Sequence, residues 1–212
     1  MTRVLVVDDH PVVRHGLRRI LTETFDRPVT VGEAADALEA LDAVERQPWD
    51  VVVLDIAMPN GGGLEVLREI RRLSPRTPVL VLSVQPEDPY AIRVLRSGAA
   101  GFLSKESAPE ELVTALRRVL AGRRYVSQST AERLAHALHE GSSDRPLHES
   151  LTDREFHVLR LLVSGMTVTE VARELGRSVK TISTHRTRLL RKLRLKSTVE
   201  AARYALALRL FE

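Results

Sequence analysis

The stretch Val51-Val-Val-Leu-Asp55 decides the fold of the first half of this 212-residue chain. Four consecutive apolar residues that run into a polar one are typical of a strand buried on both faces of a parallel sheet. Similar short apolar runs end at Asp8, at Ser83 and at Lys105. Helix-period stretches separate these runs, so we expect strands and helices to alternate.

Five strand–helix units predict an α/β fold with a doubly wound, five-stranded parallel sheet covered on both faces. The strands are expected near residues 3–7, 28–32, 50–54, 78–82 and 100–103. The helices are expected near residues 11–24, 35–46, 63–73, 88–96 and 108–121.

Polar side chains follow the apolar runs at the points where the strands should end. They are Asp8, Asp9, Asp55, Ser83 and Lys105. Ligands of open α/β sheets bind at the carboxyl ends of the strands, so we expect these side chains to converge. Clustered carboxylates favour a divalent hard cation with oxygen ligands, whereas a hydroxyl and an ammonium favour an anion such as a phosphoryl group.

The second half is predicted to be a small all-α domain of four helices. Helix starts are indicated by three capping boxes, Thr152-x-x-Glu155, Thr167-x-x-Glu170 and Ser197-x-x-Glu200, and by Ser178 as a fourth cap. The helices are expected near 152–163, 167–175, 178–193 and 197–209. Gly176 separates the second from the third, which predicts a helix-turn-helix at about 168–187.

These patterns divide the chain into residues 1–121, a linker at 122–147 and residues 148–212. Within the linker, the segment from Ser129 to Leu138 is a candidate short helix. Residues 140–146 have the composition of a flexible linker.

Positive charge is concentrated in the second half. Residues 1–124 contain 17 Lys+Arg and 18 Asp+Glu, whereas residues 125–212 contain 15 and 10. From Arg177 to Lys196 there are eight basic residues and no acidic one. A basic stripe on one helix is typical of a nucleic-acid contact, and its alternative is an ordinary solvated helix face.

Composition excludes several classes of protein. The chain has no cysteine, so it has neither a disulfide framework nor thiol chemistry. No apolar run approaches the roughly 18 residues of a membrane span, and the N-terminus lacks a signal peptide's apolar region. We therefore expect a cytoplasmic protein without membrane association.

The first half resembles the receiver domain of bacterial two-component response regulators over residues 3–121. The resemblance is carried by Asp55-Ile-Ala-Met-Pro-Asn-Gly-Gly-Gly-Leu-Glu65 and by Gly98-Ala-Ala-Gly-Phe-Leu-Ser-Lys105. The opening His10-Pro-Val-Val-Arg-His-Gly-Leu17 is typical of the NarL/FixJ subfamily.

The second half resembles the LuxR-type helix-turn-helix DNA-binding domain of the same subfamily. The segments that carry this resemblance are Leu151-Thr-Asp-Arg-Glu155, Val171-Ala-Arg-Glu-Leu-Gly176 and Val179-Lys-Thr-Ile-Ser-Thr-His185.

The receiver resemblance implies roles for the strand-end residues. Asp55 is the expected phosphoacceptor and nucleophile, assisted by Ser83 and Lys105, and Ser83 with Phe102 forms the expected switch pair. The expected Mg²⁺ ligands are Asp9, Asp55 and the backbone carbonyl of Ala57, with Asp8 acting mostly through water.

The LuxR resemblance implies that the outer face of the 178–193 helix enters the DNA major groove. We expect DNA contacts from Lys180, Ser183, Thr184, Thr187, Arg188, Arg191 and Lys192. Short hydroxyls read bases weakly, so affinity should depend on phosphate contacts, including one from Arg186. The apolar side is expected to comprise Val179, Ile182, Leu189, Leu190 and Leu193. The last helix offers Val199, Arg203, Leu206 and Ala207 either as a dimerisation face or as intradomain core.

The sequence thus predicts a two-component response regulator rather than an enzyme. The only reaction expected of this regulator is phosphotransfer to its own Asp55. A sensor histidine kinase would supply the phosphoryl group, which would control dimerisation and binding to double-stranded DNA. RNA polymerase is a further candidate partner. Two alternatives stay open: a Mg²⁺-dependent phosphatase-like enzyme using Asp55, and a DNA binder that does not respond to phosphorylation.

Overall fold

The computed structural model describes residues 1–25, 28–58, 63–83, 90–127, 131, 146–208 and 210–211. The chain forms two compact units, Met1–Leu134 and Ala135–Glu212. Most of the candidate helix at 129–138 and of the linker segment 140–146 lies outside the described residues.

The N-terminal unit contains one five-stranded sheet in the order β2-β1-β3-β4-β5, with every neighbouring pair parallel. Its strands are β1 (Thr2–Val7), β2 (Val29–Ala34), β3 (Val51–Asp55), β4 (Val79–Ser83) and β5 (Gly101–Ser104). The predicted fold class is confirmed, and each predicted strand is present with its ends shifted by at most two residues.

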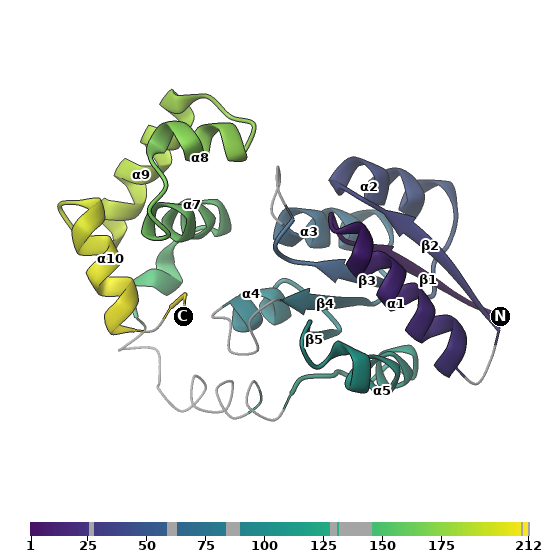
Figure 1. Cartoon of the computed structure of the whole chain (residues 1–212). Helices are drawn as coiled ribbons and strands as arrows, with labels where there is room; N and C mark the ends of the chain where they lie inside the picture. The colour runs from purple at the N-terminus through teal and green to yellow at the C-terminus, as the bar shows by residue number, and fades with distance from the viewer. Residues whose placement is uncertain are drawn as a thin grey trace. The chain divides into compact units, whose positions relative to one another are not determined.

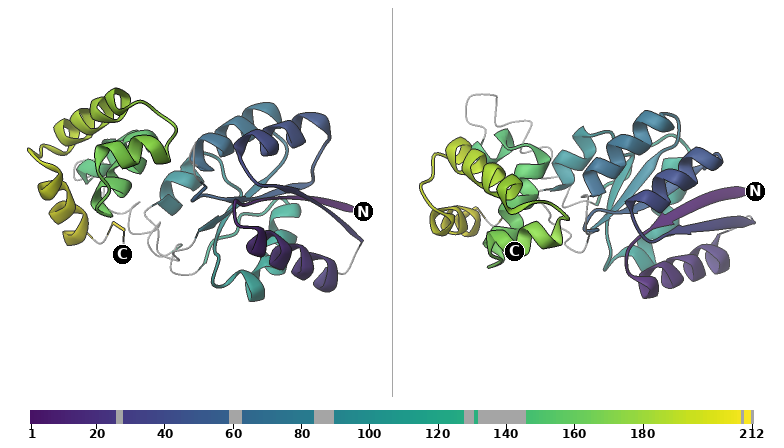
Figure 2. Two further views of the ribbon diagram at one scale, coloured as in Figure 1. Left: turned by 45° about the horizontal axis from the view of Figure 1, so that its top comes forward. Right: turned by 90° about the horizontal axis from the view of Figure 1, so that it is seen from above.

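Helices cover both faces of this sheet (Figures 1 and 2). Their bounds are α1 (Pro11–Thr24), α2 (Ala37–Arg46), α3 (Gly63–Leu73), α4 (Tyr90–Arg96) and α5 (Ala108–Leu120). The helices α1 and α5 pack together on one face, and α2 and α3 pack together on the other. The helix expected at 88–96 begins at Tyr90 in the described part, and residues 88–89 lie outside it.

Alternate residues of the strands supply the core on the side of α1 and α5. Val4 and Val6 of β1 lie in one buried cluster with Leu17 and Leu21 of α1 and Leu112 of α5. The residues between them, such as Leu5, are also fully buried. Burial on both faces explains why the strands appear in the sequence as continuous apolar runs.

After α5 the chain returns to the edge of the sheet. Tyr125 donates its backbone N–H to the carbonyl of Ala100 at 3.1 Å, and Phe102 donates to the carbonyl of Tyr125 at 2.9 Å. The Tyr125 hydroxyl is hydrogen-bonded to the Glu111 carboxylate on α5. The N-terminal unit therefore extends past residue 121, where we expected the linker to have begun.

The C-terminal unit is helical, as predicted. Its elements are the 3₁₀ turn η1 (Leu147–Ser150), α7 (Asp153–Val163), α8 (Val168–Glu174), α9 (Val179–Leu193) and α10 (Thr198–Ala207). Gly176, with a φ of 56°, lies in the turn between α8 and α9. A left-handed backbone at this point is most easily adopted by glycine.

Two of the three predicted capping boxes are confirmed. Thr152 and Thr167 each accept a bond from the backbone of a glutamate three residues later, and that glutamate returns a bond. The third prediction is wrong in its reciprocal half. Ser197 caps α10, but the Glu200 carboxylate accepts from the N–H of Lys196 instead. Ser178 caps α9, as expected.

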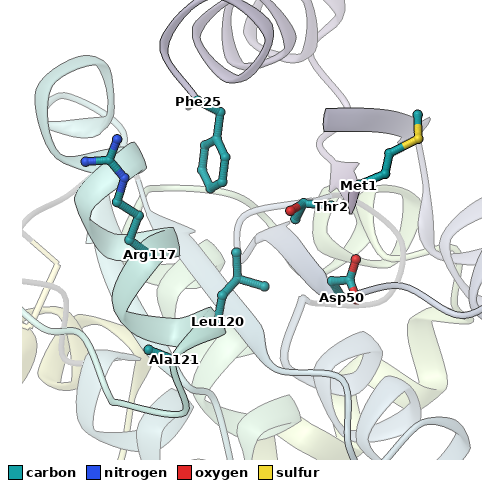
Figure 3. A pocket seen from close by; sticks show the side chains of 7 residues that line it. All are labelled: Met1, Thr2, Phe25, Asp50, Arg117, Leu120 and Ala121. Atoms are coloured by element: carbon teal, nitrogen blue, oxygen red, sulfur yellow. The ribbon is translucent and has the colours of Figure 1, made fainter. Parts of the chain in front are cut away.

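A hollow lies at the end of the sheet where the strands β1 and β3 begin (Figure 3). Arg117 and Asp50 stand on opposite sides of it, with Leu120 between them. Its lining residues are Met1, Thr2, Phe25, Asp50, Arg117, Leu120 and Ala121. Since β3 ends at Asp55, this hollow is at the opposite edge of the sheet from the predicted site.

Among the described residues, every helix is too short or too polar to span a bilayer.

Gly101 is predicted to be intolerant of a side chain, because an added Cβ would lie 2.7 Å from the Tyr125 carbonyl oxygen and 2.8 Å from Leu80 Cδ1. We expect Gly101→Ala to lower the free energy of unfolding by about 2–3 kcal/mol through overpacking. An added Cβ on Gly16 of α1 would have no atom within 4 Å of it, so Gly16→Ala should raise stability by about 0.5–1 kcal/mol. Urea unfolding followed by the fluorescence of Trp49, the only tryptophan, measures both; equal effects would contradict the packing argument.

Candidate functional sites

Two carboxylates and one ammonium meet at the carboxyl edge of the sheet. Asp8 follows β1, Asp55 ends β3, and Lys105 follows β5. Lys105 Nζ lies 2.7 Å from Asp8 Oδ2 and 2.9 Å from Asp55 Oδ2. Both carboxylates are almost fully buried. The ammonium therefore offsets the repulsion between two negative charges at low dielectric.

Short backbone contacts fix the orientation of these side chains. Asp55 Oδ1 accepts the N–H of Ala57 at 2.9 Å, and Asp8 Oδ1 accepts the N–H of His10 at 2.8 Å. Both are local bonds of the kind that aspartate makes two residues ahead. The backbone N–H of Lys105 donates to the carbonyl of Ser83 at 2.6 Å, which ties the end of β5 to the end of β4.

The start of α3 also approaches this edge closely. A Cβ on Gly63 would lie 2.5 Å from the carbonyl oxygen of Asp55 and 2.6 Å from the Cα of Ile56. Only glycine allows this approach, so Gly63 sets how closely α3 packs behind the acidic residue.

The ion pairs lower the pKa of the Asp55 carboxyl group and raise the pKa of the Lys105 ammonium. Burial raises the pKa of Asp55, and the charge of Asp8 adds to this, while bonds from Ala57 and Lys105 oppose it. Burial by itself would lower the pKa of Lys105, but contact with Asp8 and Asp55 raises it above its ordinary value. Lys105 therefore remains charged at neutral pH.

The residues at this edge fit a divalent cation. Asp8, Asp9, His10 and Asp55 each offer one ligand atom, and these atoms all lie within 4.8 Å of one another. Three of the carboxylate oxygens, one from each aspartate, are buried and make no hydrogen bond of regular geometry. Lys105 Nζ lies within ion-pair distance of the Asp8 and Asp55 oxygens, and His10 Nδ1 lies within ion-pair distance of the Asp9 oxygen. An oxygen-rich donor set of this kind suits Mg²⁺.

This cluster brings together three of the four predicted ligands. The role of the Ala57 carbonyl stays a prediction. His10 Nδ1, 2.9 Å from Asp9 Oδ1, was not among the predicted ligands. It belongs to the quoted motif that follows the acidic pair, and its placement depends on how helix α1 begins.

The predicted switch residues lie on β4, which neighbours β3, and on β5, the edge strand beyond it. Ser83 is buried at the end of β4 and pairs in register with Ser104 of β5. Phe102 is buried within β5, opposite Val81 of β4. Their roles as a switch pair stay predictions.

A second candidate surface is the outer face of α9. Six of the seven residues expected to contact DNA are exposed on this helix: Lys180, Ser183, Thr184, Thr187, Arg188 and Arg191. On the opposite side Ile182, Leu189 and Leu193 are buried. Val179 was wrongly assigned to the apolar side, because it is the first residue of the helix and is 47% exposed.

The two threonines of this face use their hydroxyl donors within the helix. Thr184 Oγ1 donates to the carbonyl of Lys180 at 2.9 Å, and Thr187 Oγ1 donates to the carbonyl of Ser183 at 3.0 Å. Each side chain therefore keeps its methyl group and its oxygen lone pairs for an external contact.

Two basic residues of α9 are engaged within the unit. Lys192 Nζ forms an ion pair with Glu155 Oε2 at 2.6 Å and donates to the carbonyl of Ser150 at 3.2 Å. Arg186 Nε donates to Thr198 Oγ1 at 3.0 Å. The structure thus gives both residues internal partners that sequence spacing did not reveal, and we leave both out of the proposed DNA contacts.

On α10, the four residues that the sequence offered either as a dimerisation face or as intradomain core are all exposed: Val199, Arg203, Leu206 and Ala207. Ala201 and Ala205 are buried within the unit. Val199 and Leu206 are 66% and 56% exposed, so these two do not belong to the core of the unit.

Comparison with known proteins identifies both halves. The family model of the response regulator receiver domain matches residues 4–117, and that of the bacterial regulatory proteins of the luxR family matches residues 149–205. The chain is a NarL/FixJ-family response regulator.

Its similarity to other response regulators extends over nearly the whole chain. It is 37% identical to the response regulator UvrY of Escherichia coli K12, over 97% of this chain and 94% of that protein. It is 40% identical to the response regulator GacA of Pseudomonas protegens, over 94% and 93%. A structure of RcsB from Salmonella enterica serovar Typhimurium, bound to the promoter rprA in the presence of the phosphomimetic BeF₃⁻, has a TM-score of 0.68. It is 29% identical and covers 96% of this chain and 97% of that one.

The Lys192–Glu155 ion pair should stabilise the C-terminal unit of this response regulator. Burial would raise the pKa of Glu155, but Lys192 and Thr152 hold it below its ordinary value. We expect Lys192→Gln to destabilise the unit by about 1–3 kcal/mol, because a buried carboxylate loses its partner. Amide hydrogen exchange of α7 and α9 in the full chain measures this change, with Lys180→Gln on the exposed face as the matched control.

The stabilisation of the C-terminal unit by the Lys192–Glu155 pair should depend on pH and decrease at acid pH. A lowered folded pKa means that the stabilisation is complete above the ordinary glutamate pKa of about 4.3 and is lost as the pH falls through the folded value. The difference between the parent and Lys192→Gln should therefore shrink at acid pH. A difference that stays constant down to pH values well below the folded pKa would refute the assignment.

Proposed function

We propose that this response regulator accepts a phosphoryl group on Asp55 from a sensor histidine kinase in the cytoplasm. The modification controls dimerisation and sequence-specific binding to double-stranded DNA, and thereby transcription. The observation that carries the proposal is the position of Lys105 Nζ, which lies 2.9 Å from Asp55 Oδ2 and 2.7 Å from Asp8 Oδ2 at the carboxyl edge of the sheet.

The residues at this edge suit phosphoryl transfer to a carboxylate. A carboxylate oxygen of Asp55 forms the new O–P bond, while the bond from phosphorus to the donor breaks and the donor keeps its electron pair. Such a transfer needs charge neutralisation more than acid–base chemistry. Lys105 supplies one positive charge, and the hydroxyl of Ser83, a residue at the end of the neighbouring strand, would donate to a phosphoryl oxygen.

Asp8, Asp9, Asp55 and the Ala57 carbonyl are the residues that would hold Mg²⁺. When bound, the ion neutralises charge on the phosphoryl oxygens. The clustered carboxylates offer oxygen ligands, which are the ligands that Mg²⁺ prefers.

Phosphorylation would redistribute the contacts of Lys105. A phosphoryl group on Asp55 competes with Asp8 for the ammonium, and Ser83 turns toward the new oxygens. Because the backbone of Lys105 is bonded to Ser83, a shift at the end of β4 also acts on β5, which carries Phe102. The modification biases an equilibrium between two conformations of this side of the receiver.

Support for the output comes from the exposed face of α9 and from the relatives. Arg188 and Arg191 are exposed and basic, so they serve as phosphate contacts, and Lys180 lies near the start of the helix. The RcsB structure named above is bound to a promoter. The exposed Val199 and Leu206 of α10 are the candidate contacts between two copies on DNA. RNA polymerase is the further partner that transcriptional control requires.

The alternatives have less support. A phosphatase-like enzyme would act on a substrate beside Asp55, and the hollow in Figure 3 does not serve that reaction, because it lies at the other edge of the sheet. A DNA binder that does not respond to phosphorylation would have no use for two buried carboxylates in contact with one lysine.

Asp55→Asn is expected to abolish the incorporation of phosphate from radiolabelled acetyl phosphate, because the amide keeps the shape of the side chain but is no longer a nucleophile. The label on the parent should be released by hydroxylamine, as an acyl phosphate is. Asp42→Asn, an exposed change on α2, should be labelled like the parent. Undiminished labelling of the Asp55→Asn variant would refute the assignment.

The methyl groups of Thr184 and Thr187 are expected to contribute to base recognition, since both hydroxyl donors are occupied within α9. Replacement by alanine should reduce discrimination between the operator and altered operators by at most about 1–3 kcal/mol, with an unchanged salt slope. Replacement by valine, which keeps a methyl group at the same branch, should preserve more of it.

The matched control is Arg188→Gln. It should weaken binding to all duplexes alike and reduce the salt slope by about one unit. Titrations against operator and scrambled duplexes at several salt concentrations separate the two effects. Equal losses on both duplexes for the alanine variants would mean that α9 is not docked as proposed.

A further inference from the structure

The motif His10-Pro-Val-Val-Arg14 directly follows the acidic pair, and the phosphoryl chemistry proposed above does not use its arginine. Arg14 lies at the start of α1, and its guanidinium turns back toward the sheet. Its Nη1 donates to the backbone carbonyl of Asp8 at 2.6 Å. Its Nε lies 3.4 Å from Glu33 Oε2 on β2. Only 14% of the Arg14 side chain is exposed, so the contact lies mostly within the protein.

We propose that Arg14 is a positioning residue of the cation site: by holding the Asp8 carbonyl, it fixes the orientation of Asp9 relative to Asp8. This inference rests on the proposed function, in which the acidic cluster binds Mg²⁺. Arg14 does not touch the cation and acts only through the backbone between the two aspartates.

The reason lies in the geometry of the peptide unit. The carbonyl of Asp8 and the N–H and Cα of Asp9 belong to one plane. A donor that fixes the carbonyl oxygen therefore also fixes the direction in which Asp9 leaves the strand. Asp9 itself follows the end of β1 and precedes α1, so no regular ladder of either element holds it.

The backbone N–H and the Oδ1 atom of Asp8 already have hydrogen-bond partners. Its N–H donates to the carbonyl of Ala34 at 3.1 Å, and its Oδ1 accepts from the N–H of His10. The bond from Arg14 completes this set at the carbonyl. Glu33 orients the guanidinium, and it also pairs with Arg18 at 2.9 Å.

Two possible roles for Arg14 predict opposite changes in Mg²⁺ affinity when the residue is replaced. As a positive charge near a cation site, Arg14 would repel Mg²⁺, so a purely electrostatic role predicts tighter binding when the charge is removed. As a positioning residue, Arg14 improves the alignment of the ligands, so its loss weakens binding. Groups that orient metal ligands typically contribute about 10- to 100-fold in affinity.

The test is the Mg²⁺ dissociation constant of the full chain, measured by isothermal titration calorimetry. We expect Arg14→Gln to weaken binding about tenfold or more. Arg14→Lys should weaken it as well, because one ammonium cannot hold the carbonyl and Glu33 in the planar geometry of a guanidinium. Arg18→Gln is the matched control, since Arg18 shares Glu33 but is 54% exposed, and it should bind Mg²⁺ within about twofold of the parent.

Two further measurements keep the result interpretable. Circular dichroism and Trp49 fluorescence establish that each variant is folded, and Glu33→Gln, which leaves Arg14 without its orienting partner, replaces Arg14→Gln if that variant does not fold. Asp9→Ala serves as the reference for a lost ligand.

The outcomes separate this inference from the proposed function. If Arg14→Gln binds Mg²⁺ as tightly as the parent or more tightly, the positioning role is wrong while the phosphoacceptor site stands. If Arg14→Gln and Arg18→Gln weaken binding equally, the effect belongs to Glu33 or to general stability, and the positioning role is again wrong. If the parent itself binds no Mg²⁺, both proposals are overturned.

Discussion

The contact of Lys105 Nζ with the carboxylates of Asp8 and Asp55 is the interaction on which the acidic edge of the sheet depends. Two almost fully buried negative charges could not lie this close together without a positive charge between them. The same contact keeps the pKa of Lys105 above its ordinary value, so the lysine stays charged. Such a site would suit the phosphoryl group that we propose Asp55 accepts, since this group carries more negative charge than the carboxylate.

The acidic edge could be predicted from sequence because each of its main residues ends a buried strand or directly follows one. Parallel strands place their carboxyl ends at one edge, so Asp8, Asp55 and Lys105 had to converge once the apolar runs were recognised as strands. Arg14 and Gly63 could not be placed in the same way. The Asp8 carbonyl contact depends on the direction of a long side chain from α1, and the Gly63 contact depends on how closely a helix approaches a strand.

In the C-terminal unit the local signals predicted where the helices begin, although the reciprocal bond of Glu200 was wrong, whereas the contacts between helices could not be predicted from the sequence. The caps at Thr152, Thr167 and Ser178 follow from residues three positions apart, and the structure confirms them. Lys192 has the sequence context of a DNA contact, yet its partner Glu155 is 37 residues away and becomes visible only when α7 and α9 pack together. Tyr125 shows the same limit in the N-terminal unit, since a single bridge to β5 leaves no periodic pattern in the sequence.

The basic residues of α9 fall into two groups, one with partners inside the unit and one exposed to solvent. Lys192 and Arg186 bind partners within their own unit, whereas Arg188 and Arg191 are exposed and are the phosphate contacts that we propose. An anchored helix loses less conformational entropy when it binds, so fixed inward contacts can support affinity without touching the DNA.

The central claim is that the chemical state of Asp55 sets the affinity for DNA. Its most direct test is the dissociation constant for a duplex selected from genomic DNA by the protein itself, measured by fluorescence anisotropy with and without Mg²⁺ and beryllofluoride. For the parent chain we expect tighter binding with beryllofluoride by a coupling of about 1–3 kcal/mol, or roughly 5- to 150-fold. For Asp55→Asn we expect no change. An equal response in both proteins, or no response in the parent, would contradict the central claim.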